Sequence, residues 1–235
     1  MPVKEFKSFI GINEMKDYKI LFKQLFAEFL GTFLYISLVL LAGTQLGTGT
    51  VTTALANGLL VATILQIIGQ VSGGHINPAV TIGAMMCGHI KLLKAVCYVI
   101  FQILGAIAGI VIDLGLLGVT MPNEQLRADQ IFALEFLMTF LLVAVFISVV
   151  DLRRGARGLG SAALAVGLSI TGCQCACLPY TGSLNPVRTL GPAVIMDVWD
   201  QHWAYWVGPI CGGVSAGLVS NFIFLRQRDD DNDDD

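Results

Sequence analysis

The 235-residue sequence predicts an all-α membrane protein in which six transmembrane helices and two re-entrant half-helices form an inverted repeat. Three observations support this fold. The chain is 55% hydrophobic and only 13% charged, with a mean hydropathy of +0.73, whereas about a quarter of the residues of a soluble domain are charged. Six apolar segments are each long enough to cross about 30 Å of hydrocarbon as a helix. The tripeptide Asn77–Pro78–Ala79 returns as Asn185–Pro186–Val187.

The apolar segments divide the chain. We expect the spans near residues 21–43, 51–70, 92–115, 131–150, 160–178 and 203–225. The segment before the first span lacks the compact apolar stretch and small-residue site of a cleavable signal peptide, so we expect the first span to direct insertion itself. The predicted units are an N-terminal segment (1–20), a membrane domain (21–225) with repeats over about 21–115 and 131–225, and an acidic tail (226–235).

Basic residues gather on one side of this topology. The basic residues of this side lie in the N-terminal segment, in the connections after the second and fourth spans, and at the C-terminus. They are Lys4, Lys7, Lys16, Lys19, Lys23, Lys91, Lys94, Arg153, Arg154, Arg157, Arg226 and Arg228. The opposite connections carry only Arg127 and Arg188. Because Lys and Arg accumulate in cytoplasmic loops, we expect both termini to be cytoplasmic.

The two halves of the sequence repeat each other. The segment AEFLGTF at 27–33 matches LEFLMTF at 134–140, so that Glu28 and Glu135 hold equivalent positions. The interval from Asn77 to Asn185 is almost the same as that from Glu28 to Glu135. Each half contains three spans, and an odd number turns the second half upside down relative to the first. Inverted repeats are typical of membrane transport proteins, with the site near the bilayer midplane between the halves.

The Asn-Pro motifs predict two short helices that begin inside the membrane. Asn is a favoured helix N-cap and Pro is favoured at the first helical position. Residues 77–88 and 185–196 would each span roughly 18 Å, about half a bilayer. Their N-termini carry partial positive charge and free N–H groups, which are tolerated at that depth only in protein or beside a water-filled cavity. The pair therefore predicts a pore.

Glu28 and Glu135 are costly to place within spans and have two interpretations. Each carboxylate could accept hydrogen bonds from backbone N–H groups of the re-entrant loops, or the pair could relay protons. We favour the bracing role because both residues occupy the same position of the repeat.

The motifs HINPAV at 75–80 and TGSLNPVR at 181–188, the paired Glu-containing spans and the chain length resemble the aquaporin (major intrinsic protein) family. The resemblance covers residues 20–225 and is closest to the water-channel branch, as an insect-like member with an atypical selectivity filter. It implies an aquaporin-like channel for water and a homotetramer in which every protomer has its own pore.

The resemblance also implies roles for individual residues. The side-chain amides of Asn77 and Asn185 would face the pore at the midplane, beside Pro78, Ala79, Pro186 and Val187. Backbone carbonyls lining the pore would be those of Gly73, Gly74, His75, Ile76, Gly182, Ser183 and Leu184. The four-residue selectivity filter would be Asn57, Gln174, Ser183 and Arg188.

This filter departs from the family pattern. Water-selective relatives carry an aromatic residue at the position of Asn57 and a His at that of Gln174. We therefore expect a wider, more polar mouth that passes water and small uncharged solutes such as glycerol or urea, and that excludes protons and ions. The glycerol-carrying branch has an Asp after its Arg, where this chain has Thr189, so a water-only channel stays an alternative.

Two further residues have more than one interpretation. Val187 replaces the usual Ala of the second motif, either as a repacked helix start, which we favour, or as a narrower pore centre. His75 lies in the first re-entrant loop and could line or gate the pore or brace the loop.

Other functions are less well supported by the sequence. A coupled secondary transporter would also use an inverted repeat, and a non-conducting structural membrane protein would tolerate an altered filter. Cys173 and Cys177 share a helix face while Cys175 points away, so we expect buried thiols and not a metal site. We expect a multi-pass protein of the lipid bilayer, in the plasma membrane, without enzymatic activity, cofactor or nucleic-acid partner.

Overall fold

The computed structural model describes residues 8–44, 49–116, 126–150, 161–177 and 180–224. Its elements are the short 3-10 helix η1 (Ile12–Met15), the helices α2 (Tyr18–Thr44), α3 (Thr50–Ser72), α4 (Pro78–Met86), α5 (Leu92–Leu116), α6 (Ala128–Val150), α7 (Ala162–Cys177), α8 (Pro186–Met196) and α9 (Ala204–Val219), and the π-helical turn η3 (Ser220–Phe224). The acidic tail and the basic residues Lys4, Lys7, Arg153, Arg154, Arg157, Arg226 and Arg228 lie outside the described residues.

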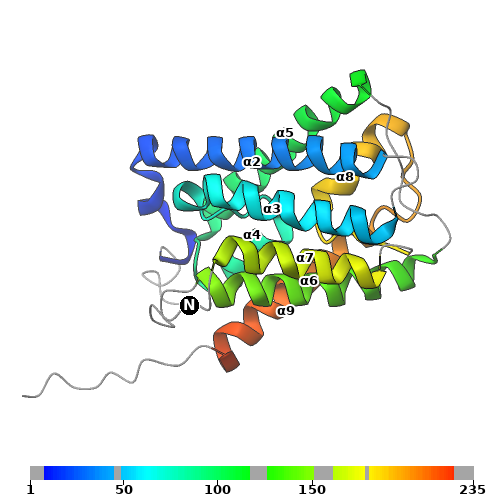
Figure 1. Cartoon of the computed structure of the whole chain (residues 1–235). Helices are drawn as coiled ribbons and strands as arrows, with labels where there is room; N and C mark the ends of the chain where they lie inside the picture. The colour runs from blue at the N-terminus through cyan, green and yellow to red at the C-terminus, as the bar shows by residue number, and fades with distance from the viewer. Residues whose placement is uncertain (1–7, 45–48, 117–125, 151–160, 178–179, 225–235) are drawn as a thin grey trace, which may run out of the picture.

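Six helices form the membrane bundle and two short ones lie inside it. Within the described residues, α2, α3, α5, α6 and the run from α9 through η3 are long and apolar enough to cross a membrane, and α7 is a shorter apolar helix. Figure 1 shows the long helices side by side, with the start of α2 and the end of α9 at the same end of the bundle. That placement agrees with the even number of spans expected from the sequence.

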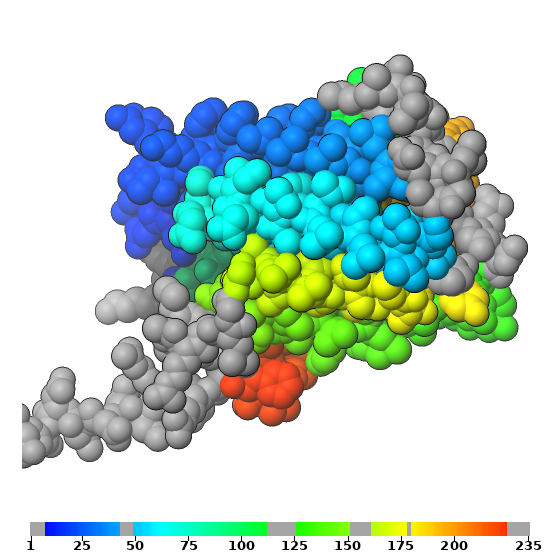
Figure 2. All heavy atoms as spheres, in the orientation of Figure 1, coloured from blue at the N-terminus to red at the C-terminus, as the bar shows by residue number. Residues whose placement is uncertain are grey.

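The outer surface of the bundle is suited to hydrocarbon. In Figure 2, α2, α3 and α7 lie against one another across the visible face. Large apolar side chains exposed on α3 and α7 are Leu55, Leu59, Ile67, Leu164 and Leu168. Apolar side chains on the outside and packed helices within are what a lipid environment requires.

Repeat-related helices pack in repeat-related ways. Helix α2 packs on α5 as α6 packs on α9. At Gly105 of α5, an added Cβ would lie 2.4 Å from the Phe29 carbonyl oxygen, and at Gly212 of α9 it would lie 2.4 Å from that of Phe136. Gly105 and Gly212 hold equivalent positions of the two halves, as do Phe29 and Phe136. Only glycine allows the backbones to approach this closely.

Helices α3 and α7 cross where the two halves meet. An added Cβ at Gly58 would lie 2.3 Å from the Gly167 carbonyl oxygen, and one at Gly167 would lie 2.3 Å from that of Gly58. The two glycines are each other's partner in the segments ANGL at 56–59 and AVGL at 165–168. The sequence repeat is thus a structural one, with its axis at this crossing.

The half-helices begin at their Asn caps as expected. The Asn77 side chain accepts a hydrogen bond from the Ala79 N–H at 2.8 Å, and Pro78 is the first helical residue of α4. Helix α4 ends at Met86, before the expected end at residue 88. Gly88 follows in the left-handed conformation (φ 82°), which ends a helix.

We predict that Gly58→Ala destabilises the fold by about 1–3 kcal/mol, because its methyl group overlaps the Gly167 carbonyl in a fully packed crossing. The matched control is Gly69→Ala in the same helix, where an added Cβ meets nothing within 4 Å. Helix propensity alone favours Ala over Gly by about 1 kcal/mol, so the control should be neutral or stabilising. Thermal unfolding in detergent, followed by size-exclusion chromatography, measures both. Equal melting temperatures would contradict the tight crossing.

Candidate functional site

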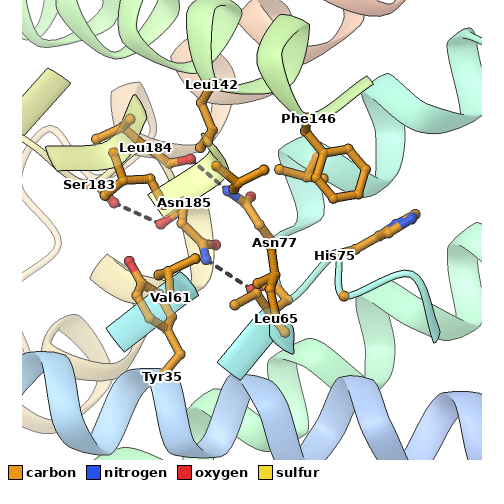
Figure 3. A pocket seen from close by; sticks show the side chains of 15 residues that line it. Tyr35, Val61, Leu65, His75, Asn77, Leu142, Phe146, Ser183, Leu184 and Asn185 are labelled. Carbon is orange, nitrogen blue, oxygen red and sulfur yellow. Dashed lines mark hydrogen bonds between the residues drawn. The ribbon is translucent and has the colours of Figure 1, made fainter. Parts of the chain in front are cut away.

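The N-termini of the two half-helices meet inside the bundle. The Asn77 Nδ2 donates to the Leu184 carbonyl oxygen at 2.8 Å, and the Asn185 Nδ2 donates to the Ile76 carbonyl oxygen at 3.0 Å (Figure 3). Each asparagine therefore bonds to the loop of the other half. The structure brings the two Asn-Pro motifs together, as the inverted repeat implied.

The helix caps fix the orientation of both amides. The Oδ1 atoms accept from the backbone N–H groups of Ala79 (2.8 Å) and Val187 (3.2 Å), so the Nδ2 atoms must point away from their own helices. Each Nδ2 carries two hydrogens and uses one in the bond to the opposite loop. The second hydrogen of Asn77 and of Asn185 is available to a molecule in the cavity that both residues line.

The residue before each asparagine has a left-handed backbone. Ile76 has φ 46° and Leu184 has φ 54°, and both side chains are buried. This conformation is costly for a β-branched residue and persists only where the surroundings hold it. Their carbonyl groups are the ones that accept from the opposite asparagine. The sequence carries no signal for this strain beyond the equivalent positions of the two residues.

Glu28 holds the first re-entrant loop. Its Oε1 accepts from the Ser72 hydroxyl (2.6 Å) and the His75 N–H (2.9 Å). Its Oε2 accepts from the Ile76 N–H (2.7 Å) and the Gln102 Nε2 (2.7 Å). The side chain has no solvent exposure. Four donors around one carboxylate give each of its two oxygens two hydrogen bonds.

Glu135 holds the second loop in the same way. Its Oε1 accepts from the Thr181 hydroxyl (2.5 Å) and the Ser183 N–H (2.9 Å), and its Oε2 accepts from the Leu184 N–H (2.7 Å). It too is fully buried. Each glutamate thus accepts hydrogen bonds from two consecutive backbone N–H groups of a re-entrant loop.

The meeting point opens into a small cavity with a mainly apolar wall. The space that water centres can occupy there is about 20 Å³, enough for about one water molecule. Apolar and aromatic residues of the wall are Tyr35, Val61, Leu65, Val80, Leu142, Phe146, Val166 and Ile170. Sequence reasoning missed these residues, because a pore-facing apolar side chain and a core side chain have the same helical periodicity.

The polar part of the cavity comes from the two loops. The first half contributes Gly74, His75, Ile76 and Asn77, and the second half contributes Ser183, Leu184 and Asn185. A mobile molecule in this cavity therefore finds polar partners in the two loops and at the hydroxyl of Tyr35.

His75 both lines the cavity and braces the first loop. Its Nδ1 lies 3.1 Å from the Thr81 hydroxyl, and its ring meets those of Tyr98 and Phe146 edge-on, with centroids 5.3 Å apart in both pairs. Tyr98 in turn donates its hydroxyl to the Ser72 carbonyl at 2.9 Å. The ring is thus held against α4, α5 and α6 beside the cavity.

The other expected pore carbonyls lie in the same loops. Gly73 and Gly74 have φ of 93° and 67°, a conformation that favours glycine, and Gly73 also ends helix α3. The Gly182 carbonyl accepts from two side chains of the predicted filter, Gln174 and Arg188.

The predicted filter residues gather around Gly182. Gln174 Nε2 donates to its carbonyl at 2.7 Å, Arg188 donates to the same oxygen, and Asn57 Nδ2 donates to Gln174 Oε1 at 2.7 Å. Ser183, the next residue, donates its hydroxyl to the Asn185 carbonyl at 2.7 Å. We expected a wider, more polar mouth from these residues. The two amides are fully buried and bonded to each other, and within the described residues the Asn57 Oδ1 atom is buried without a hydrogen-bond partner.

Val187 lies away from the cavity. Its side chain has no solvent exposure and packs in the apolar core. Its methyl groups pack at the start of α8.

Comparison with known proteins gives a consistent result. The family profile described as Major intrinsic protein matches residues 14–220. The chain is 39% identical over 219 residues to the lens fiber major intrinsic protein of Lithobates pipiens (88% of this chain, 83% of the relative). It is 40% identical over 233 residues to human aquaporin-4 (90% of this chain, 72% of the relative). Among solved structures, that of the aquaglyceroporin from Plasmodium falciparum is similar, with a TM-score of 0.75 and 26% identity, covering 87% of this chain and 97% of that chain.

We predict that Glu28→Gln strongly destabilises the protein. The new amide turns an acceptor into a donor that faces N–H groups, and a hydrogen bond to a charged group contributes about 1.5–3 kcal/mol. Glu135→Gln should cost less, because one of its carboxylate oxygens accepts a single bond. The exposed Glu14→Gln is the matched control. Melting temperatures in detergent should fall most for Glu28→Gln and least for the control, and a Glu28→Gln protein as stable as Glu14→Gln would refute the bracing role.

Proposed function

The chain belongs to the major intrinsic protein family, and we propose on that basis that it is a passive transmembrane channel for water and for small uncharged solutes such as glycerol or urea, which excludes protons and ions. One observation carries the proposal. Two capped helix ends from opposite halves meet at one cavity, and each keeps one amide hydrogen for a molecule inside it.

This geometry favours a single orientation of water. The oxygen of a water molecule between Asn77 and Asn185 accepts from both amides, and the positive ends of α4 and α8 favour the same orientation. Its hydrogens then point along the pore towards its neighbours, and it accepts no proton from them. Proton hopping stops at this molecule, and the positive field of the helix ends opposes cations.

The apolar wall explains how the water leaves again. Conduction requires binding strong enough for entry and weak enough for release. The aliphatic side chains of Val61, Leu142, Val166 and Ile170 offer a passing molecule no hydrogen bond, so polar contact is confined to the two loops and the Tyr35 hydroxyl. The contrast between the apolar wall and the polar groups of the cavity favours single-file movement of water over a stable bound state.

The proposed selectivity filter consists of Asn57, Gln174, Ser183 and Arg188, at the outer end of the passage. Arg188 is half-buried and places a permanent cation there, which opposes cations and donates to uncharged solutes. The similarity to an aquaglyceroporin supports including polyols among the solutes. We assign the loop-bracing role to Glu28 and Glu135.

We further propose the setting of the channel. Cytoplasmic termini are supported by Lys16, Lys19 and Lys23, which precede or begin α2, and by Lys91 and Lys94 at the start of α5. We place the channel in the plasma membrane. The channel domain spans residues 21–225, the repeats cover about 21–115 and 131–225, and four copies assemble with a pore in each. We propose no enzymatic activity and no cofactor.

Purified protein in liposomes should conduct water by a channel mechanism. We expect stopped-flow shrinkage well above that of empty vesicles, with a low activation energy and no need for a proton gradient. Glycerol and urea gradients should cause slower swelling that is also above background. A proton requirement would indicate a coupled transporter, and no flux above empty vesicles would indicate a structural protein.

Arg188→Val should admit protons. The substitution removes the positive charge from the outer mouth, and we expect at least about a tenfold rise in proton leak, which corresponds to ~1.4 kcal/mol of barrier. Arg127→Val is the matched control, because Arg127 is largely exposed and pairs with Asp129. A pH-sensitive dye inside the vesicles measures the leak. Equal leak in both variants would rule out the proposed barrier.

A further inference from the structure

We propose that a row of phenylalanines on α2, with two lysines at its N-terminal end, binds one anionic phospholipid. The phosphate of this lipid lies at the lysines and one of its acyl chains lies along the phenylalanines. The lipid belongs to the leaflet in which α2 begins, which is the cytoplasmic leaflet in the proposed topology. The site is separate from the passage and does not depend on what the channel conducts.

The row, which we call the aromatic ladder, consists of Phe22, Phe26, Phe29 and Phe33. Successive rings are stacked, with centroids 6.4, 6.3 and 6.4 Å apart and planes that differ by 16°, 26° and 9°. Phe22 and Phe26 are 64% and 50% exposed. The rings therefore form one continuous apolar surface along the outside of α2.

Contacts of α2 place the ladder beside α5 and its far end near the bilayer midplane. Gly105 of α5 approaches the α2 backbone at Phe29 and Phe33, whereas α3 packs on the side of Gly31. An added Cβ at Gly31 would also lie 2.8 Å from the Cγ2 atom of Ile76, in the loop where the two half-helices meet. Because that meeting point is the proposed midplane, the ladder ends at about the depth where the two leaflets meet.

The length of the ladder matches one leaflet. A helix rises by 1.5 Å per residue, so the ladder extends over about 16 Å from its first to its last ring. Half of the hydrocarbon thickness of a bilayer is about 15 Å. One acyl chain that starts at the lysine end can therefore contact all four rings.

Two lysines supply the charge that a phosphate needs. Lys19 and Lys23 are exposed, and each precedes a ladder residue by three positions, so both lie on the ladder's side of the helix. Helical side chains lean towards the N-terminus, which brings the two ammonium groups towards the depth of the headgroups. Asp17 also lies at this end, but its carboxylate caps α2 by accepting from the Ile20 N–H at 3.1 Å. Cations beside an apolar row favour a lipid with net negative charge.

The second half of the chain shows that the fold does not require this arrangement. The repeat partners of the two lysines and of the two exposed rings are neither basic nor aromatic: they are Leu126, Asp129, Gln130 and Ala133. Both halves nevertheless pack their helices in the same way. The exposed rings and the lysines are thus additions to one half, on the side of one leaflet, and a lipid of that leaflet accounts for both.

Native mass spectrometry tests the headgroup preference. The full chain, purified in detergent, is supplied with equal amounts of palmitoyl-oleoyl phosphatidylglycerol and palmitoyl-oleoyl phosphatidylcholine, which differ only in the headgroup. We expect one phosphatidylglycerol per chain to be retained in preference to phosphatidylcholine. The double variant Lys19→Gln and Lys23→Gln should retain about tenfold less phosphatidylglycerol and the same amount of phosphatidylcholine.

The matched control for charge is the double variant Lys16→Gln and Lys91→Gln. It removes the same charge from the same end of the bundle and should retain phosphatidylglycerol as the wild-type protein does. Equal phosphatidylglycerol retention in both double variants would overturn the proposed site, and so would an equal loss.

Photolabelling tests the position of the acyl chain. Phosphatidylglycerol with a diazirine at the end of one acyl chain, in phosphatidylcholine liposomes, should label α2 near Phe33. Labelling should fall in the double variant Phe22→Ala and Phe26→Ala but not in Phe222→Ala, which removes an exposed ring from η3. Even labelling of all outward-facing helices would show only general contact with the bilayer and would overturn the inference. An interchain disulfide formed by Phe22→Cys and not by the wild-type protein would show that a second copy covers this surface, which would also overturn it.

Discussion

The structure depends on how it provides hydrogen-bond partners for non-helical backbone inside a membrane. Hydrocarbon offers no hydrogen bonds, so every N–H group of the two re-entrant loops needs a partner from the protein. Glu28 and Glu135 supply it for two consecutive loop N–H groups each, reaching them from a long helix. A buried carboxylate is expensive, and the several donors around each one offset that cost. The charge is therefore part of the loop structure.

The proposed bracing role of Glu28 and Glu135 also accounts for the direction of the Asn77 and Asn185 donors. With the N–H groups of Ile76 and Leu184 held on the carboxylate side, these residues take up left-handed backbone and turn their carbonyl groups towards the opposite loop. Each carbonyl accepts from the asparagine of the other half. Neither loop is complete without its counterpart, which gives a physical reason for the repeat to occur twice in one chain.

Much of the helix arrangement and of the loop contacts was predictable from the sequence, although the hydrogen bonds among the predicted filter residues were not. Glu28, Glu135 and the Asn-Pro motifs are recognisable because carboxylates in spans and helix-capping pairs are rare enough to stand out. The expected spans match the helices to within a few residues, and the half-helices begin at the predicted caps. What stayed hidden has no local signature, since a buried Ile with positive φ looks like any other Ile and the cavity wall has the periodicity of the core. Asn57 and Gln174 are far apart in sequence, and their mutual bond follows from proximity at the crossing of α3 and α7. Polarity in a sequence therefore does not measure the polarity that a permeating molecule meets.

The two halves differ most where selectivity is expected. In the first half, Gln102 donates to Glu28 from behind the loop. The equivalent position of the second half is Pro209, which has no donor, and Glu135 accepts three bonds where Glu28 accepts four. The second loop is held instead from the other side, where Gln174 and Arg188 both donate to Gly182. The inverted repeat needs both loops fixed but does not dictate which side chains hold them, so the two halves meet the same backbone requirement with different donors.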